Sequence, residues 1–233
     1  MIKKIAGYFG YSLIRKRKSP TLESHLELIL KSQQINLVID VGANIGQFGK
    51  MLRKIGYTGE IVSFEPVDST FRVLETTASN DVNWKVFKLA LSDKNEEIYI
   101  NTFKSSDFAS ILTPNQFGED RFESMRIKDK EKIQTTTLDS IFPEEGISGK
   151  KILLKMDTQG YDLQVFKGGH KFTSHVRSII SEISFQPIYD GMPNYREVLG
   201  VYEAQEFAVT GLYPVTRNKN LSIIEMDCVL IKM

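Results

Sequence analysis

A glycine-rich turn between two apolar runs constrains the fold more than any other feature of this sequence. Residues 37–41 are apolar except for Asp40 and rich in β-branched side chains, and they lead directly into the turn that contains Gly42 and Gly46. Such a run is typical of a parallel strand that is buried on both faces. Between residues 45 and 55 the apolar residues recur at helical spacing, and a second apolar run follows at 61–64. The stretch therefore predicts one β-α-β unit.

An acid follows the second predicted strand. Glu65 lies about 20 residues beyond the glycine turn, where an acid in α/β proteins accepts hydrogen bonds from ribose hydroxyls. Gly42 and Gly46 permit positive φ and a close approach of the backbone to a ligand. Asn44, however, stands where the dinucleotide fingerprint has its second glycine, which lets the backbone approach a pyrophosphate. A nucleoside without phosphates therefore fits this turn, and S-adenosylmethionine (SAM) is the candidate; a turn that binds no ligand is the alternative.

Four further residues are candidates for contacts with this cofactor. Asp40, at the tip of the first strand, is placed to hold the ammonium of the amino-acid end, directly or through water. Asn44 is placed to hydrogen-bond the carboxylate of the same end. Ser92 and Asp93 follow the third predicted strand and are expected to meet the adenine edge, although an aspartate there is also typical of a plain turn.

The rest of the chain continues the alternation of strands and helices. Helices are predicted at 21–32, 68–78 and 194–205, and a further helix after the strand at 151–156 ends at residue 167. Strands are predicted at 84–91, 97–103, 133–138, 151–156, 176–183, 207–215 and 223–232. This order predicts an α/β fold: a Rossmann-like, doubly wound, mostly parallel seven-stranded sheet with a small edge-strand insertion. No helix separates the last two strands, so the last is expected to run antiparallel. That layout is typical of class I methyltransferases. Residues 104–131 show no core pattern, which is usual for a functional or disordered loop.

Composition narrows the function further. The chain has 233 residues, enough for one large α/β domain, with 41% hydrophobic and 25% charged residues. A net charge of +1 gives no global field that would favour nucleic acid, and no base-flipping motif is present. One cysteine, Cys228, excludes an internal disulfide and fits a cytoplasmic location. No apolar run reaches the roughly 20 residues of a membrane span, and no signal-peptide core is found.

The basic residues gather at the N-terminus. Residues 1–20 hold six Lys or Arg and no acid, and apolar residues recur at helical spacing within 1–19. We expect residues 1–35 to form a basic helical segment packed on the core, and residues 36–233 to form the SAM-dependent methyltransferase domain. Two alternatives remain open for the segment: a weak peripheral contact with an anionic membrane face, or a cover over the active site. The sequence indicates no oligomeric state.

From residue 36 to the C-terminus the sequence resembles the FkbM-type SAM-dependent methyltransferases. The matching motifs lie at residues 38–48, 64–66, 90–93, 137–139, 154–168, 180–183 and 225–227. Members of this family methylate hydroxyl groups, many of them on sugars of polysaccharides, glycolipids or secondary metabolites. The resemblance implies a SAM-dependent O-methyltransferase acting on a hydroxyl of a sugar, a glycan or a related polyol. Thr158 and Gln159 stand where the family often has Val-Glu, which leaves an acid role at 159 in doubt.

Two carboxylates are the candidate catalytic groups. Asp157 and Glu182 come at the ends of two strands that should be neighbours, so both are expected at the carboxyl edge of the sheet, where ligands bind in α/β proteins. Either the pair ligates a divalent metal that acidifies the acceptor hydroxyl, or one acts as a general base whose pKa is raised by burial. No metal is assigned. The structural alternative is that Asp157 caps the next helix and Glu182 pairs with a basic residue.

The acceptor side has weaker candidates. Ser106 and Ser110 belong to a hydroxyl-rich segment that matches one in the family, and they are expected to line the acceptor pocket. Tyr189 lies beyond the strand that carries Glu182 and is expected to touch the substrate. His170 and His175 are alternative bases. A competing class of function is a non-catalytic, Rossmann-like binding or scaffold module in a glycan-assembly complex, which the presence of the cofactor residues argues against.

Overall fold

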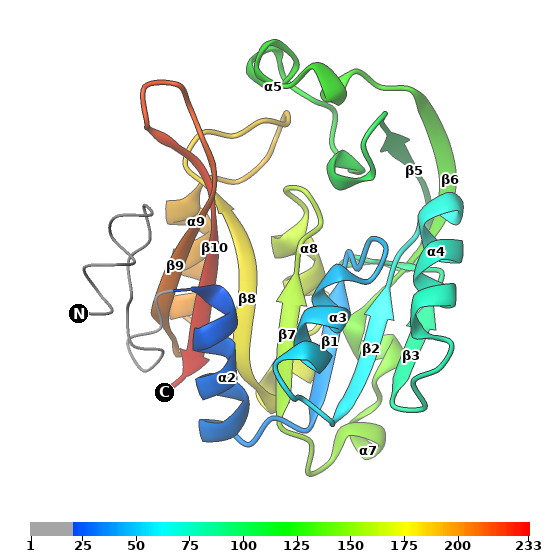
Figure 1. Ribbon diagram of the computed structural model, residues 1–233, viewed down its shortest axis with the longest axis vertical. Coiled ribbons are helices and arrows are strands. Elements are labelled where there is room, and N and C mark those ends of the chain that lie inside the picture. The colour runs from blue at the N-terminus through cyan, green and yellow to red at the C-terminus, as the bar shows by residue number, and fades with distance from the viewer. Residues whose placement is uncertain (1–20) are drawn as a thin grey trace, which may run out of the picture.

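The computed structural model describes residues 21–233 and contains two sheets (Figure 1). The large sheet has the order β3-β2-β1-β7-β8-β10-β9, and the small one the order β4-β6-β5. In the large sheet β10 is antiparallel to both of its neighbours, and every other pair is parallel, which confirms the predicted fold class. Of the predicted N-terminal segment at residues 1–35, residues 1–20 lie outside the described residues. The strands are β1 (Leu37–Val41), β2 (Glu60–Phe64), β3 (Trp84–Phe87), β4 (Ala90–Leu91), β5 (Glu97–Thr102), β6 (Asp129–Thr136), β7 (Ile152–Met156), β8 (Val176–Ser184), β9 (Phe207–Arg217) and β10 (Ile223–Lys232).

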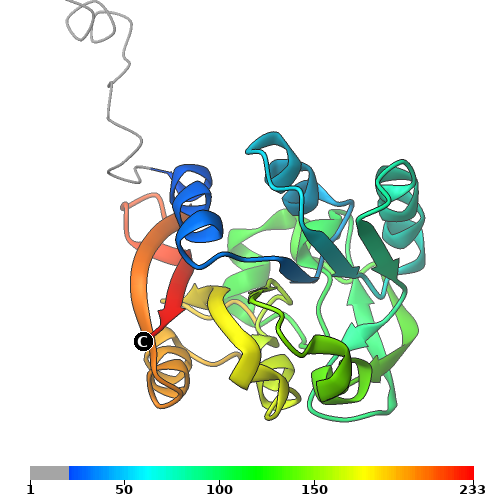
Figure 2. The same ribbon diagram turned by 90° about the horizontal axis from the view of Figure 1, so that it is seen from below.

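Helices cover both faces of the large sheet (Figure 2). One face carries α2 (Leu22–Ser32), α3 (Gln47–Lys54) and α4 (Asp68–Ala78). The other carries α6 (Leu138–Ile141), α7 (Glu144–Ile147), α8 (Asp162–Lys167) and α9 (Tyr195–Glu203). A separate hydrophobic cluster fills the space under each layer. Because both faces are covered, β1 and β7 are buried at every position, which is why they read as continuous apolar runs. Thr21 is the N-cap of α2, and it forms a capping box with Ser24.

Strand register places the two predicted catalytic acids at one level. β7 and β8 pair in parallel, with Met156 opposite Ser181. Asp157 and Glu182 are the next residues along each strand, so they meet at the carboxyl edge. The parallel strands β1 and β2 end at the same edge, which is where the chain around α5, β5 and β6 lies (Figure 1).

The structure differs from the prediction at two places. The third predicted strand, 84–91, is two strands: β3 ends at Phe87, and β4 pairs with β6 in the small sheet. Residues 104–131 hold three short elements, η2 (Ser106–Phe108), α5 (Gln116–Arg121) and η3 (Glu123–Met125), and the start of β6 at Asp129. Their apolar side chains pack against distant residues, among them Ile188, Tyr189, Met192 and Ile224. No local periodicity appears because the core of this region is built between segments far apart in the chain.

Gly49 allows α3 to pack closely on β3. A Cβ at this position would lie 2.2 Å from the ring of Trp84, whose indole N–H donates to Ser63 Oγ at 3.0 Å. Replacing a glycine inside a helix by alanine normally raises the free energy of unfolding by roughly 0.5–1 kcal/mol. We expect Gly49→Ala instead to lower the free energy of unfolding by about 2 kcal/mol, because the helix must move away from the ring.

Gly200 in α9 is the matched control. Nothing lies within 4 Å of a Cβ built there. Gly200→Ala should therefore raise the free energy of unfolding by about 0.5–1 kcal/mol in urea denaturation, the ordinary helix effect. If Gly49→Ala stabilises the protein as Gly200→Ala does, the packing of α3 against Trp84 is wrong.

Candidate active site

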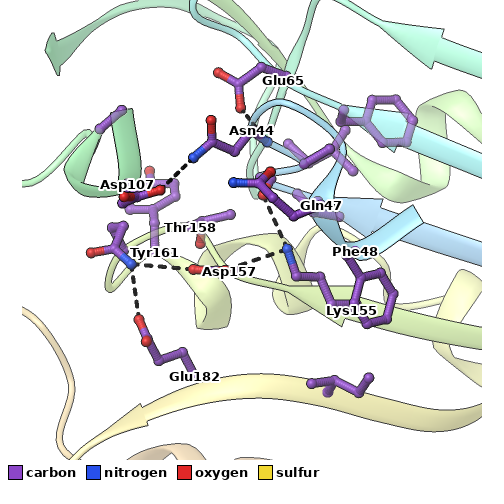
Figure 3. A pocket seen from close by; sticks show the side chains of 18 of the residues that line it. Asn44, Gln47, Phe48, Glu65, Asp107, Lys155, Asp157, Thr158, Tyr161 and Glu182 are labelled. Carbon is purple, nitrogen blue, oxygen red and sulfur yellow. Dashed lines mark hydrogen bonds and ion pairs between the residues drawn. The ribbon is translucent and has the colours of Figure 1, made fainter. Parts of the chain in front are cut away.

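A pocket of about 490 Å³ opens at the carboxyl ends of β1, β2, β7 and β8 (Figure 3). Its size is in the range of small-molecule and cofactor sites. Its walls come from the glycine turn and α3, the ends of β2 and β7, residues 89–91, one residue of β5, the segment around η2, two residues each of α2 and β8, and one each of β9 and β10. Residues from segments far apart in the sequence thus meet in one cavity.

The glycine turn packs so closely against the end of β7 that Gly42 has no space for a side chain. Gly42 has a φ of +72°, and a Cβ there would lie 2.0 Å from the carbonyl oxygen of Asp157. Only glycine fits this position, both for its conformation and for its contact. Gly46 also has a positive φ, but it does not line the pocket; its missing side chain lets α3 begin against Leu74, Thr77 and Trp84.

Glu65 faces the pocket as a buried carboxylate. One oxygen accepts from the backbone N–H of Val67 at 2.9 Å, and the other from that of Asn44 at 3.0 Å. Burial raises the pKa of Glu65 to about 7, although these two backbone hydrogen bonds act in the opposite direction. Each oxygen keeps a second lone pair, so the fixed carboxylate can still accept from two ligand hydroxyls.

An apolar wall stands beyond Glu65. It is made of Pro66, Leu89, Ala90, Leu91, Ile100, Ala109 and Ile111. Ser92 and Asp93, expected at the adenine edge, do not line the pocket. Ser92 is fully buried, and its hydroxyl lies 3.2 Å from Asp93 Oδ1 and 3.4 Å from the hydroxyl of Tyr161, which does line it. The chain turns away here because β4 leaves the large sheet to pair with β6.

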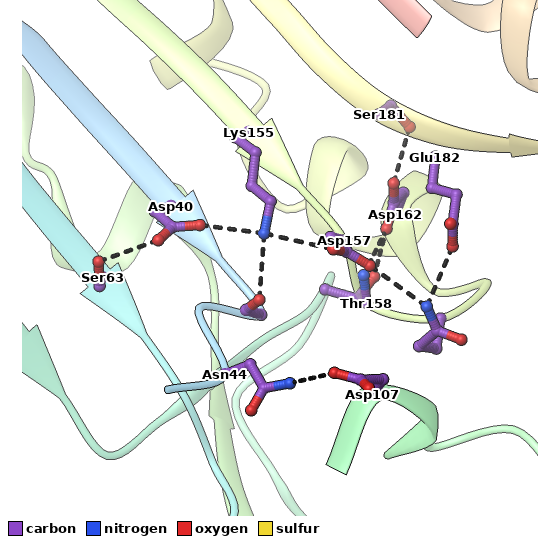
Figure 4. A network of polar contacts seen from close by, with 12 residues as sticks. Asp40, Asn44, Ser63, Asp107, Lys155, Asp157, Thr158, Asp162, Ser181 and Glu182 are labelled. Atoms are coloured by element: carbon purple, nitrogen blue, oxygen red, sulfur yellow. Dashed lines mark hydrogen bonds and ion pairs between the residues drawn. The ribbon is translucent and has the colours of Figure 1, made fainter. Parts of the chain in front are cut away.

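Asp40 lies behind the pocket and pairs with Lys155 (Figure 4). Asp40 is fully buried; its carboxylate accepts from Ser63 Oγ at 3.1 Å and lies 3.1 Å from Lys155 Nζ. Lys155 Nζ also donates to the carbonyl of Gly42 at 3.1 Å and lies 3.5 Å from Asp157 Oδ2. Burial alone would lower the pKa of Lys155, but Asp40 and Asp157 outweigh it and raise that pKa. Asp40 itself does not line the pocket, whereas its partner Lys155 does.

Lys155 is a pocket residue that our sequence reasoning missed. The signal was present, since a lysine in an otherwise apolar, fully buried strand needs a charged partner. We expect Lys155→Met to lower the free energy of unfolding by about 3–5 kcal/mol, because it leaves Asp40 ionised and unpaired in the core. Asp40→Asn/Lys155→Met should recover most of that loss in urea denaturation. Equal instability of the single and double variants would contradict the pairing.

Gln159 bridges the two predicted catalytic carboxylates. Its side-chain amide nitrogen lies 3.3 Å from Asp157 Oδ1 and 3.0 Å from Glu182 Oε2. Asp157 does not cap α8; the N–H and hydroxyl of Thr158 are bound instead by Asp162, at 2.9 and 2.5 Å. Glu182 pairs with no basic side chain among residues 21–233. Burial, and then the neighbouring carboxyls of Glu225 and Asp157, raise the pKa of Glu182 well above its ordinary value.

The predicted acceptor residues divide into two groups. Ser106 lines the pocket, and its hydroxyl donates to Asn44 Oδ1 at 3.0 Å, which joins the glycine turn to η2. Ser110 and Tyr189 are buried and do not line it. The Ser110 hydroxyl donates to the Gln159 carbonyl at 2.8 Å, and the Tyr189 hydroxyl to Gln159 Oε1 at 3.1 Å. They therefore hold Gln159 in place.

Histidines do not contribute to the pocket. All three lie within residues 21–233, and none lines it. No helix in that range is long and apolar enough to cross a bilayer. In the same range, no group of three or more His, Cys, Asp or Glu side chains is arranged to hold a metal ion.

Comparison with known proteins gives the family. Residues 40–208 match the methyltransferase FkbM domain. The 2-O-methyltransferase NoeI of Sinorhizobium fredii is 26% identical over 203 residues, which cover 83% of this chain and 82% of that protein. An rRNA methylase from Streptococcus thermophilus superposes with a TM-score of 0.50 at 11% identity, over 96% of this chain and 99% of that one. Magnesium protoporphyrin IX methyltransferase from Synechocystis, solved with bound SAM, has a TM-score of 0.48 at 7% identity, over 91% of this chain and 78% of that one. The fold is that of class I methyltransferases, and the chain belongs to the FkbM methyltransferase family.

Proposed function

We propose that this protein is a SAM-dependent O-methyltransferase that acts on a hydroxyl of a sugar or a related polyol. The observation that carries the proposal is one pocket that contains both a glycine turn with a buried acid, Glu65, and a separate pair of carboxylates, Asp157 and Glu182. A methyltransferase needs a nucleoside site and an acceptor site side by side. The likeness to a 2-O-methyltransferase over most of both chains supports oxygen as the acceptor atom.

The pocket residues fit SAM. Glu65 would accept from the ribose hydroxyls, and the apolar wall from Pro66 to Ile111 would cover the adenine. Gly42 leaves room for the backbone to approach the amino-acid end, and the acids around the pocket complement a cation. When bound, SAM supplies a methyl group on a positively charged sulfur that leaves as a neutral thioether.

The acceptor side must orient an alcohol and remove its proton. An alcohol is a weak nucleophile at neutral pH, so a positioned base is needed. Glu182 is suited to this role, since burial and neighbouring acids raise its pKa well above its ordinary value, which makes the carboxylate a stronger base. Glu182 would take the proton of the acceptor hydroxyl, whose oxygen would receive the methyl group that SAM supplies. Asp157, whose side chain is 43% exposed, and Gln159 orient the hydroxyl.

A direct assay tests the proposal. Purified full-length protein is incubated with SAM labelled in its methyl group and a panel of hexoses, deoxyhexoses and polyols, and methyl ethers are identified by mass spectrometry. SAM and S-adenosylhomocysteine should each raise the melting temperature, because both bind only the native state. A protein that binds neither compound at millimolar concentration is not a SAM-dependent enzyme. Binding without transfer to any hydroxyl would favour the scaffold function.

A further inference from the structure

The pocket contains more acidic side chains than the proposed methyl transfer requires. Six of the described residues that line the pocket are acidic, and Lys155, already paired with Asp40 and Asp157, is the one basic residue among them. The acids are Glu23, Glu65, Asp107, Asp157, Glu182 and Asp227. Glu65 belongs to the ribose position, whereas Glu182 and Asp227 lie on β8 and β10, beyond the strands that hold the cofactor residues.

Strand pairing brings a third carboxyl to these two. Asp227 lies directly opposite Glu182 in the antiparallel ladder of β8 and β10. Glu225 lies two residues from Asp227 on the same strand, so its side chain emerges on the same face of the sheet. That face is the one covered by α2 and α3, since Ile180 and Val229, which share it, pack in their hydrophobic cluster.

Glu225 has a buried oxygen without a partner. The residue is 4% exposed, and its Oε1 makes no hydrogen bond in the described chain. A buried acceptor without a donor costs free energy, so such an atom indicates a missing partner. Burial, and after it the nearby carboxylate of Asp157, raise the pKa of Glu225 to about 7 and that of Asp227 to about 6. Each of these effects would be relieved by a cation placed among the three carboxyls.

We propose that Asp227, which lines the pocket, and Glu225, which is buried and does not line it, form a subsite beside Glu182 for a protonated amine of the acceptor, close to the hydroxyl that is methylated. The acceptor is then an amino sugar or a related amino alcohol. This inference rests on the proposed function, because it places the hydroxyl at Glu182. Vicinal amine and hydroxyl groups lie close enough for opposite residues of two paired strands to contact both.

An organic ammonium fits this subsite better than a metal ion. Among residues 21–233 the acids are not arranged as a metal site. An ammonium needs only scattered acceptors for its three N–H donors, and the carboxyls provide these. The charge of the pocket also disfavours acceptors that carry phosphate or carboxylate groups near the hydroxyl.

Binding of matched sugars tests the inference. The full-length protein, saturated with S-adenosylhomocysteine, is titrated calorimetrically with glucosamine, galactosamine and mannosamine, with their N-acetyl derivatives, and with the parent hexoses. We expect at least one amine to bind about tenfold or more tightly than both its N-acetyl derivative and its parent hexose. Asp227→Asn and Glu225→Gln should each remove most of this preference and leave the affinity for S-adenosylhomocysteine within about twofold. Glu75→Gln, at an exposed position of α4, should change neither.

Three results would overturn the inference. The first is equal binding of amines, N-acetyl derivatives and hexoses; the second is an amine preference that survives Asp227→Asn and Glu225→Gln. The third is amine binding that appears only after Arg15, Lys16, Arg17 and Lys18 are replaced by glutamine, which would show that the chain's own basic residues occupy the carboxyls. Failure of the proposed function is distinct, because the protein would then not bind S-adenosylhomocysteine at all.

Discussion

Replacing Glu65 by alanine is expected to weaken the binding of S-adenosylhomocysteine by about 100-fold. The carboxylate is held by two backbone N–H groups, so it presents fixed acceptors to the ribose. Hydrogen bonds to a charged group contribute roughly 1.5–3 kcal/mol each, and about 3 kcal/mol in total corresponds to about 100-fold in affinity. Isothermal titration of both proteins measures the difference.

Two controls separate binding from folding. Glu75→Ala changes an exposed glutamate and should leave the affinity unchanged. Far-UV circular dichroism must show that Glu65→Ala is folded, because the substitution also leaves the N–H groups of Asn44 and Val67 without their acceptors. A folded Glu65→Ala variant with wild-type affinity would remove Glu65 from the cofactor site.

The raised pKa of Glu65 adds a pH dependence to the same experiment. Hydroxyl groups of the ligand donate to the ionised carboxylate and stabilise it. Below a pH of about 7 Glu65 is mostly protonated, and it must lose that proton for the ligand to bind. The affinity of the wild type should therefore rise from pH 5 to pH 8, and less so in Glu65→Gln. The unliganded protein should show the opposite trend. A carboxyl whose folded pKa is raised lowers stability as pH increases from about 5 to 7.

Replacing Glu182 by glutamine is expected to lower kcat by about 1,000-fold while cofactor affinity stays constant. A positioned general base contributes roughly 100- to 10,000-fold to a rate, and glutamine keeps the size of the side chain but cannot take a proton. Single-turnover methyl transfer at saturating SAM and acceptor measures the loss. A residual rate that no longer depends on pH between 5 and 8 would identify the missing base.

Asp157 provides the comparison for Glu182. It contacts Lys155 and Gln159 and is more exposed, so Asp157→Asn should cost about 10- to 100-fold in kcat through poorer orientation of the acceptor. Glu75→Gln again serves as the unchanged control. Should Asp157→Asn lose more activity than Glu182→Gln and flatten the pH profile, the two roles are reversed. Wild-type turnover in both variants would exclude this end of the pocket as the acceptor site.

Local sequence patterns predicted most of the scaffold. Buried parallel strands, the glycine turn and the acid at the end of β2 each leave a signal within a few residues, because chain conformation and two-sided burial act locally. The order of strands and helices then predicted the sheet and the reversed last strand, since connection rules allow few alternatives. Positions at the carboxyl edge, Glu65, Asp157 and Glu182 among them, follow from that topology.

Tertiary structure decided which side chains meet. The fit of Gly42 against Asp157, the pairing of Asp40 with Lys155, and the bridge of Gln159 between two acids each join segments that the sequence leaves far apart. Ser92 sits behind the pocket because β4 pairs with β6 in the small sheet, and Tyr189 because it packs in the cluster that contains Met125 and Ile188. The alignment of Asp227 with Glu182 depends on the register of β8 and β10, and a shift of one residue would turn Asp227 to the other face. A sequence specifies which residues a strand carries, whereas long-range pairing determines what those residues contact.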